Sequence, residues 1–77
     1  MSERWAVQWH SENRLDGLQR YFLWENYQPV LFLTRSEARA WIKAKLGYIA
    51  KREDLRREPH GWRVPKAIRV RVELVPL

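Results

Sequence analysis

The chemistry available to this chain is limited by the side chains that it holds. It contains no cysteine, and its only neutral-pH acid–base groups are His10 and His60, which lie fifty residues apart and lack metal-site spacing. Glu53 and Asp54 are adjacent acids, but the arginines around them favour solvated ion pairs over a paired-carboxylate site. No phosphate-binding glycine loop or nucleophile motif occurs. We therefore expect a protein that is not an enzyme and that needs no cofactor and no metal.

A segment in which cationic and aromatic side chains are interleaved is the strongest candidate for binding. Arginine forks bind phosphate or carboxylate, and aromatic rings stack on bases or fill a pocket in a partner. The alternative is that Trp62 and Tyr48 close a small core while the charges are merely solvated. The predicted binding residues are Arg52, Arg56, Arg57, His60, Trp62, Arg63, Lys66, Arg69 and Arg71.

The distribution of charge also favours an anionic partner. The formal net charge is +6, yet residues 1–34 hold three arginines against four acids, whereas residues 35–77 hold twelve Lys or Arg against five acids. A positive excess confined to one part of the chain indicates nucleic acid or an acidic protein face. The alternative is an ordinary well-solvated small protein, for which a net charge of about 2–8 is normal. Nothing indicates a small-molecule substrate, and both a monomer and a small homo-oligomer remain open.

Length and composition predict one domain over residues 1–77 with one modest core. Hydrophobic residues make up 45% and aromatic residues 13% of the chain, which argues against disorder. No apolar run of about 18 residues is present, so we expect no membrane span. The first residues lack the apolar run of a signal peptide, and the expected location is the cytoplasm.

The first half of the chain predicts a β-hairpin. Trp5 to His10 alternates like a strand, a turn is expected at Gly17, and Leu18 to Trp24 reads as a second strand. Residues 25–29 are expected to form a loop. The short apolar run from Val30 to Leu33 is either a continuation of the second strand or a strand of its own. We expect this hairpin to build the core and the scaffold.

A helix over residues 35–46 is the clearest prediction. Thr34 and Glu37 have the spacing of a capping box, in which each side chain satisfies the other residue's backbone N–H. Gly47 is a natural residue to end the helix. The apolar side chains that share one face of the helix are Ala38, Trp41, Ile42 and Leu46.

The last part of the chain predicts a short helix or an ordered loop and then a strand. Residues 48–58 end at Pro59, and a strand follows in which apolar side chains at Ile68, Val70, Val72 and Leu74 alternate with charged ones. We place Arg69 and Arg71 on its outer face, where they either extend the basic surface or protect the edge from aggregation. The predicted fold is α+β in β-β-α-β order: an antiparallel three-stranded sheet with the main helix on one face and the last strand beside the first.

Four segments of the sequence carry a resemblance to small uncharacterised proteins of tailed bacteriophages and prophages. These are Asn13 to Gly17, Leu31 to Arg39, Gly47 to Ile49 and Pro59 to Pro65. The resemblance implies no functional residues. It implies an accessory protein that binds stoichiometrically to a host protein complex acting on nucleic acid, such as a defence, transcription or DNA-processing complex, and inhibits or modulates it. The alternative function is direct, sequence-nonspecific binding of DNA or RNA.

Overall fold

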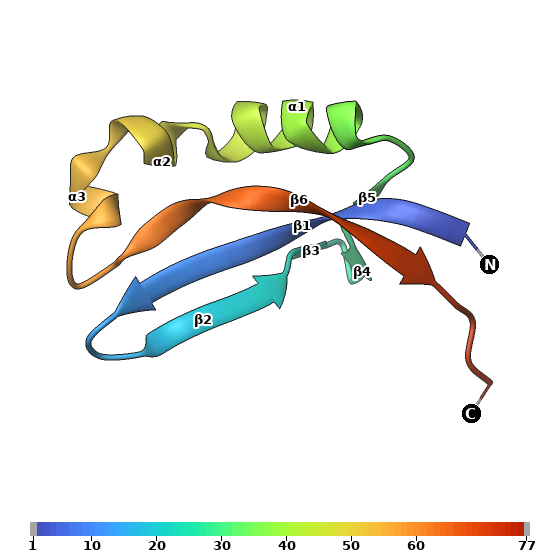
Figure 1. The fold of residues 1–77 in the computed structure, drawn as a ribbon, viewed down its shortest axis with the longest axis horizontal. Coiled ribbons are helices and arrows are strands. Elements are labelled where there is room, and N and C mark those ends of the chain that lie inside the picture. Colours follow the sequence, from blue (N-terminus) through green and yellow to red (C-terminus); the bar gives the residue numbers. More distant parts are fainter. Residues whose placement is uncertain (1, 77) are drawn as a thin grey trace.

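In the computed structural model, which describes residues 2–76, one long strand organises the main sheet (Figure 1). This strand, β1 (Ser2–Asn13), pairs antiparallel along one edge with β6 (Trp62–Val72). Its other edge is shared by β2 (Gly17–Phe22) and by β5 (Leu31–Phe32). The sequence-based prediction that the last strand lies beside the first is therefore confirmed.

The prediction of a three-stranded sheet is wrong, because the main sheet has four strands. The chain leaves the sheet after β2 and returns to it at Leu31, so two short strands fill the edge that one strand was expected to fill. The apolar run near Leu31 is accordingly a strand of its own. The coarser prediction, an α+β fold with antiparallel strands and one main helix, is confirmed.

The excursion between β2 and β5 forms a second, two-stranded sheet, where a loop was expected. It consists of β3 (Trp24–Glu25) and β4 (Gln28–Pro29). The two residues of the turn, Asn26 and Tyr27, both have positive φ, at 52° and 65°, as a type I′ turn requires. The side chain of Tyr27 is fully exposed, and that of Trp24 is 66% exposed.

Helix α1 spans Arg35–Leu46, which confirms the predicted bounds. The Thr34 hydroxyl accepts the Glu37 N–H at 3.2 Å and donates to the Glu37 carboxylate at 3.0 Å. One half of the capping box is thus confirmed, while the carboxylate bonds to the hydroxyl and not to the Thr34 N–H. Gly47 keeps a right-handed φ of −62°, so the chain continues into two single-turn helices, α2 (Tyr48–Lys51) and α3 (Glu53–Arg56).

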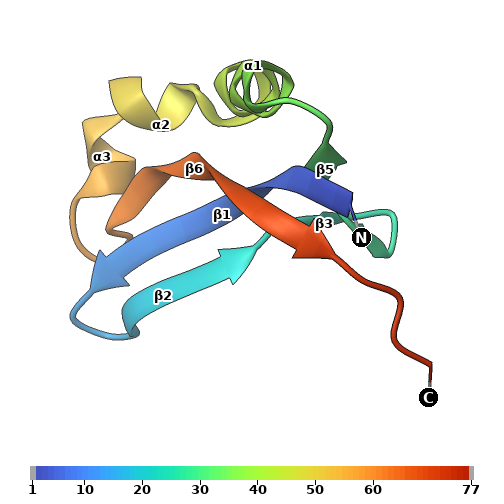
Figure 2. The ribbon, with the colours of Figure 1, turned by 45° about the vertical axis from the view of Figure 1, so that its right-hand side comes forward.

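All three helices lie on the same side of the main sheet (Figure 2). Trp5 on β1 stands directly opposite both Phe32 on β5 and Arg69 on β6. Because residues directly opposite each other point to the same face of a sheet, these three side chains share one face. The Arg35 guanidinium of α1 lies 5.9 Å from the centre of the Trp5 ring, and the ring of Phe32 lies 6.1 Å from that of Trp41. Arg69 therefore shares the helix-bearing side.

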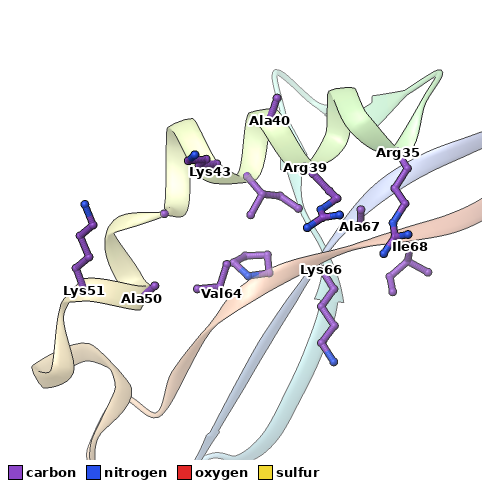
Figure 3. Close-up of a pocket in the computed structure, with 13 residues that line it drawn as sticks. Arg35, Arg39, Ala40, Lys43, Ala50, Lys51, Val64, Lys66, Ala67 and Ile68 are labelled. Atoms are coloured by element: carbon purple, nitrogen blue, oxygen red, sulfur yellow. The ribbon is translucent and has the colours of Figure 1, made fainter.

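Three apolar side chains of β6 face away from the helices, and Arg69 and Arg71 alternate with them on the helix-bearing side. The prediction that Arg69 and Arg71 lie on an outer face is therefore wrong. Ile68 stands opposite Ala6, and both point to the helix-free side, which we call the open face of the sheet. Val70 and Val72 follow Ile68 by alternation, and all three stay half-buried. The small side chain of Ala67 faces α1 instead and lines the space between the helix and the strand (Figure 3).

The core lies between the helices and the sheet. None of its buried residues comes from β2, which is exposed along its whole length, so only the first strand of the hairpin builds the core. None of the helices within residues 2–76 is long and apolar enough to cross a membrane. The buried apolar residues of this core are Val7, Ala38, Ile42, Ile49 and Leu55, and Ala6 is buried on the open face.

Candidate anion-binding groove

A groove of about 840 Å³ runs between α1 and β6 and is lined by cationic side chains (Figure 3). Helix α1 contributes Arg35, Arg39 and Lys43, whose spacing of four residues places them along one flank of the helix. Lys51 of α2 and Lys66 of β6 add two more positive charges, and no acidic residue lines the space. We call this space, with its five cations, the basic groove.

Apolar groups form the rest of the lining. They include Ile42 and Ala50 from the helices, and Val64, Pro65 and Ala67 from β6. Pro65 lies where the register of β6 against β1 shifts by one residue, which is a position that tolerates a residue without an N–H. Because an apolar wall excludes water and lowers the local dielectric constant, it strengthens the attraction between the groove's cations and a bound anion.

The cations of the basic groove have no acidic partners within residues 2–76. The four ion pairs there all lie elsewhere: Arg52–Asp54 at 2.7 Å, Arg57–Glu53 at 2.9 Å, Arg71–Glu73 at 3.8 Å and Arg69–Glu3. The hydrogen bond from Arg52 lowers the pKa of Asp54, and the same contact raises the pKa of Arg52. Four of the ten Lys and Arg side chains outside the groove are thus in ion pairs within residues 2–76, whereas none of the five inside it is.

The flank of α1 that faces the groove is unfavourable for the helix itself. Like charges four residues apart destabilise a helix by about 0.2–0.5 kcal/mol per pair, and Arg35, Arg39 and Lys43 make two such pairs. The Arg35 guanidinium is held over the ring of Trp5, which orients it before any ligand arrives. Local stability therefore gives no reason for this stripe, while binding of an anion does.

The structure distributes the predicted binding residues over several parts of the molecule and does not gather them on one surface. Only Lys66 lines the basic groove. Arg63 and Arg71 lie eight positions apart on one strand, so about 26 Å of extended chain separates them. Arg52, Arg56 and Arg57 lie on and beside α3, and Arg69 and Arg71 each face an acid near the far end of β6.

His60 and Trp62 belong to an aromatic cluster at the hairpin end of the sheet. The ring centres of His60 and Trp62 lie 5.3 Å apart, Trp62 packs edge-on against Trp9 at 5.3 Å, and Trp9 stacks on Tyr21 at 6.3 Å. The Asn13 side chain donates to the His60 carbonyl at 3.0 Å and so ties the hairpin turn to the loop before β6. These contacts pack the half-buried Trp62 against its aromatic neighbours.

Four of the five groove cations, Arg35, Arg39, Lys43 and Lys51, were absent from the predicted site. The spacing of the three α1 cations is visible in the sequence, where they lie mostly off the apolar face of the predicted helix. The missing information was tertiary: nothing local indicates that this flank would lie over the free edge of the last strand. Within residues 2–76, no group of three or more His, Cys, Asp or Glu side chains is placed to hold a metal ion.

Comparisons with protein-family models, with curated proteins and with solved structures found no match. The resemblance to small phage proteins therefore remains a prediction.

Proposed function

We propose that this protein is a non-enzymatic accessory protein that binds stoichiometrically to a partner complex and modulates it by holding a polyanionic part of that complex in the basic groove. The observation that carries this proposal is the set of five uncompensated cations around one apolar-walled space. In keeping with the phage resemblance, the proposed partner is a host protein complex that acts on nucleic acid. Both an acidic protein segment and a nucleic-acid backbone offer the required charge.

A matched pair of charge reversals on α1 tests whether the basic groove binds anions. Arg39→Glu changes a groove residue, whereas Lys45→Glu makes a change of similar sign and size on the same helix outside the groove lining. The probes are fluorescently labelled oligo-glutamate, single-stranded DNA and duplex DNA, and the readout is fluorescence anisotropy. We expect at least one probe to bind, with a loss of about tenfold or more for Arg39→Glu, equivalent to about 1.4 kcal/mol, and little change for Lys45→Glu.

Folding does not confound this comparison. Arg39→Glu replaces two repulsive contacts on the helix surface, with Arg35 and Lys43, by attractive ones, each worth about 0.2–0.5 kcal/mol. The variant should therefore unfold thermally at or above the temperature of the wild-type protein. Equal affinities of the two variants for every probe, or no binding of any probe by the wild-type protein, would contradict the proposal.

The host-complex part of the proposal has its own test. The wild-type protein, Arg39→Glu and Lys45→Glu are each used to capture partners from a nuclease-treated bacterial lysate. The expected result is a protein that the wild type and Lys45→Glu retain and that Arg39→Glu does not. If nuclease treatment removes every groove-dependent partner, the protein partner is excluded and nucleic acid takes its place.

Direct nucleic-acid binding is the second candidate function, and the open face of the sheet favours it. His10 stands opposite Arg20 on one neighbouring strand and Arg63 on the other, so three basic side chains form a row. Lys66, opposite Gln8 in the next row, also lines the basic groove, which makes the positive surface continuous around the edge of β6. A phosphate backbone crossing this edge would meet cations on both sides.

Salt dependence tests this second function. The logarithm of the duplex-DNA affinity should fall with the logarithm of the salt concentration, with a slope of about −0.9 for each neutralised phosphate. Replacing Arg20, Arg63 and Lys66 together by Glu should weaken binding and make the slope shallower. An unchanged slope and affinity in that triple variant would exclude this surface as the nucleic-acid contact.

A further inference from the structure

The outer edge of β6 has no strand beside it. Within residues 2–76, β6 pairs only with β1, so half of its backbone N–H and C=O groups point away from the sheet without a strand to receive them. From Lys66 to Val72 the pairing with β1 is regular, because the register shift lies on the other side of Lys66. These seven residues form an extended edge that another strand could join.

This edge opens into the basic groove. Side chains of β6 that point to opposite faces of the sheet line the same space: Ala67 points toward α1, whereas Lys66 and Ile68 point away from it (Figure 3). A groove bordered by both sets must run along the backbone edge between them. The cationic flank of α1 lies above this edge, with Arg35 and Arg39 directed down toward it.

We propose that the basic groove takes an extended acidic segment of a partner protein, which adds to the outer edge of β6 as a fifth strand of the main sheet. This inference rests on the proposed function and names the chemistry of the partner. Main-chain hydrogen bonds to the edge would supply affinity, and side chains at alternate positions would supply specificity. The chemistry of each face follows from the side chains that flank the edge.

The two faces of the added strand meet different surroundings. Side chains on the helix side would lie beneath Arg35, Arg39 and Lys43, which select carboxylates. Side chains on the open face would lie beside the half-buried Ile68 and Val70, which select apolar groups. The groove therefore fits a segment in which acidic and apolar residues alternate.

The charges of β6 itself disfavour another occupant of the edge, namely a second copy of this chain. Pairing β6 with β6 would bring Arg69 and Arg71 of one chain close to the same residues of the other, and like charges on neighbouring strands are destabilising. It would also bring two copies of the cationic flank of α1 together. An acidic strand at this edge would be attracted by the same cations that repel a second copy. Electrostatic interactions therefore favour an acidic partner segment over self-association.

The test uses three synthetic peptides of seven residues, matched to the length of Lys66–Val72, in which Glu and Val alternate. One peptide is unmodified. The second is N-methylated at every Glu, and the third at every Val, so that each modified peptide loses the N–H groups along one of its two edges. The wild-type protein, Arg39→Glu and Lys45→Glu are titrated with each peptide, and amide hydrogen exchange of β6 is followed by NMR.

Strand addition predicts an asymmetric result. One N-methylated peptide should bind about tenfold or more weakly than the unmodified peptide, because its methyl groups face β6, while the other should bind nearly as well. The unmodified peptide should slow exchange at alternate amides between Lys66 and Val72, and Arg39→Glu should abolish both effects while Lys45→Glu keeps them.

Other outcomes separate this inference from the proposed function. If both methylated peptides bind as well as the unmodified one and Arg39→Glu still abolishes binding, the groove captures anions by charge alone and the inference of strand addition is overturned. If single-stranded DNA binds in the groove and no peptide does, the partner class is nucleic acid and the inference is again overturned. Absence of binding to every peptide and every DNA would overturn the inference and the proposed function together.

Discussion

The two edges of β1 support very different structures. On one edge, β6 and the helices above it enclose Ile49, Ile42 and Leu55 and leave a groove of uncompensated positive charge. On the other edge, β2 runs exposed along its length and leads to the β3–β4 hairpin with its exposed Trp24. The difference shows that stability and charge are concentrated on the same side of a small domain. The groove is therefore built beside the most firmly packed part of the molecule.

Truncating one aliphatic side chain on each side of β1 tests this contrast most strongly. Ile49 is fully buried, so Ile49→Ala should lower the free energy of unfolding by about 2–5 kcal/mol. That is a large share of the total for a domain of this size, which is of the order of 4–12 kcal/mol. Leu18 on β2 is 51% exposed, so Leu18→Ala should cost well under about 1 kcal/mol. Urea denaturation measures both, and equal losses would show that β2 shares in the core.

Two glycines with positive φ give a second comparison of the two sides. Gly61 (φ 63°) precedes β6, and a Cβ there would overlap the carbonyl oxygen of Glu12. Gly17 (φ 71°) begins β2 and has open space around it. Gly17→Ala should cost only the strain of left-handed backbone, about 1–2 kcal/mol. Gly61→Ala should cost about 1–3 kcal/mol more, because β1 and the start of β6 must separate. Similar unfolding midpoints for the two variants would refute the close approach of these strands.

Sequence reasoning succeeded where the signal was local and failed where it depended on which elements meet. The α1 bounds followed from the cap at Thr34 and from a 3.6-residue period, both of which are contained in a dozen residues. The direction of Ile68 did not follow, because strand alternation separates two faces without saying which one a helix will cover. In this protein the register of β6 on β1 turns Ala67 toward α1 and Ile68 away from it.

The candidate site shows the same limit. Clustering along the sequence selected Arg52, Arg57 and their neighbours, but acids within four residues neutralise those two arginines through ion pairs. The five cations of the basic groove come from α1, α2 and β6, which only the tertiary fold brings together. A count of charge in the C-terminal half therefore does not indicate which of its cations the fold brings together.

On the exposed side of the molecule, the turn of the β3–β4 hairpin allows a stabilising change. Tyr27 holds a positive φ of 65° with a fully exposed side chain, and a type I′ turn strongly favours glycine at this second position. Tyr27→Gly should raise the free energy of unfolding by a few tenths up to about 1 kcal/mol. Tyr27→Ala removes the same ring but keeps the backbone strain, so its stability should not rise. If both variants gain equally in thermal unfolding, removal of the ring and not relief of the backbone is the cause.

The smallest expected effect concerns the ion pair beside α3, which is the paired counterpart of the unpaired cations in the basic groove. The hydrogen bond from Arg52 lowers the pKa of Asp54 below its usual value of 3.8, so folding favours the ionised carboxylate. The resulting stability is present at pH values above the unfolded pKa and is lost as the pH falls through the folded pKa. Asp54→Asn should therefore be slightly less stable than the wild type at pH 7 and should lose that difference in acid, below about pH 4. Because both side chains are more than half exposed, the neutral-pH difference should also shrink in high salt.

Urea denaturation of the wild type and of Asp54→Asn measures this difference. If the difference between their urea midpoints persists unchanged at pH 2.5, the Asp54 carboxylate stabilises the fold by a route other than its charge.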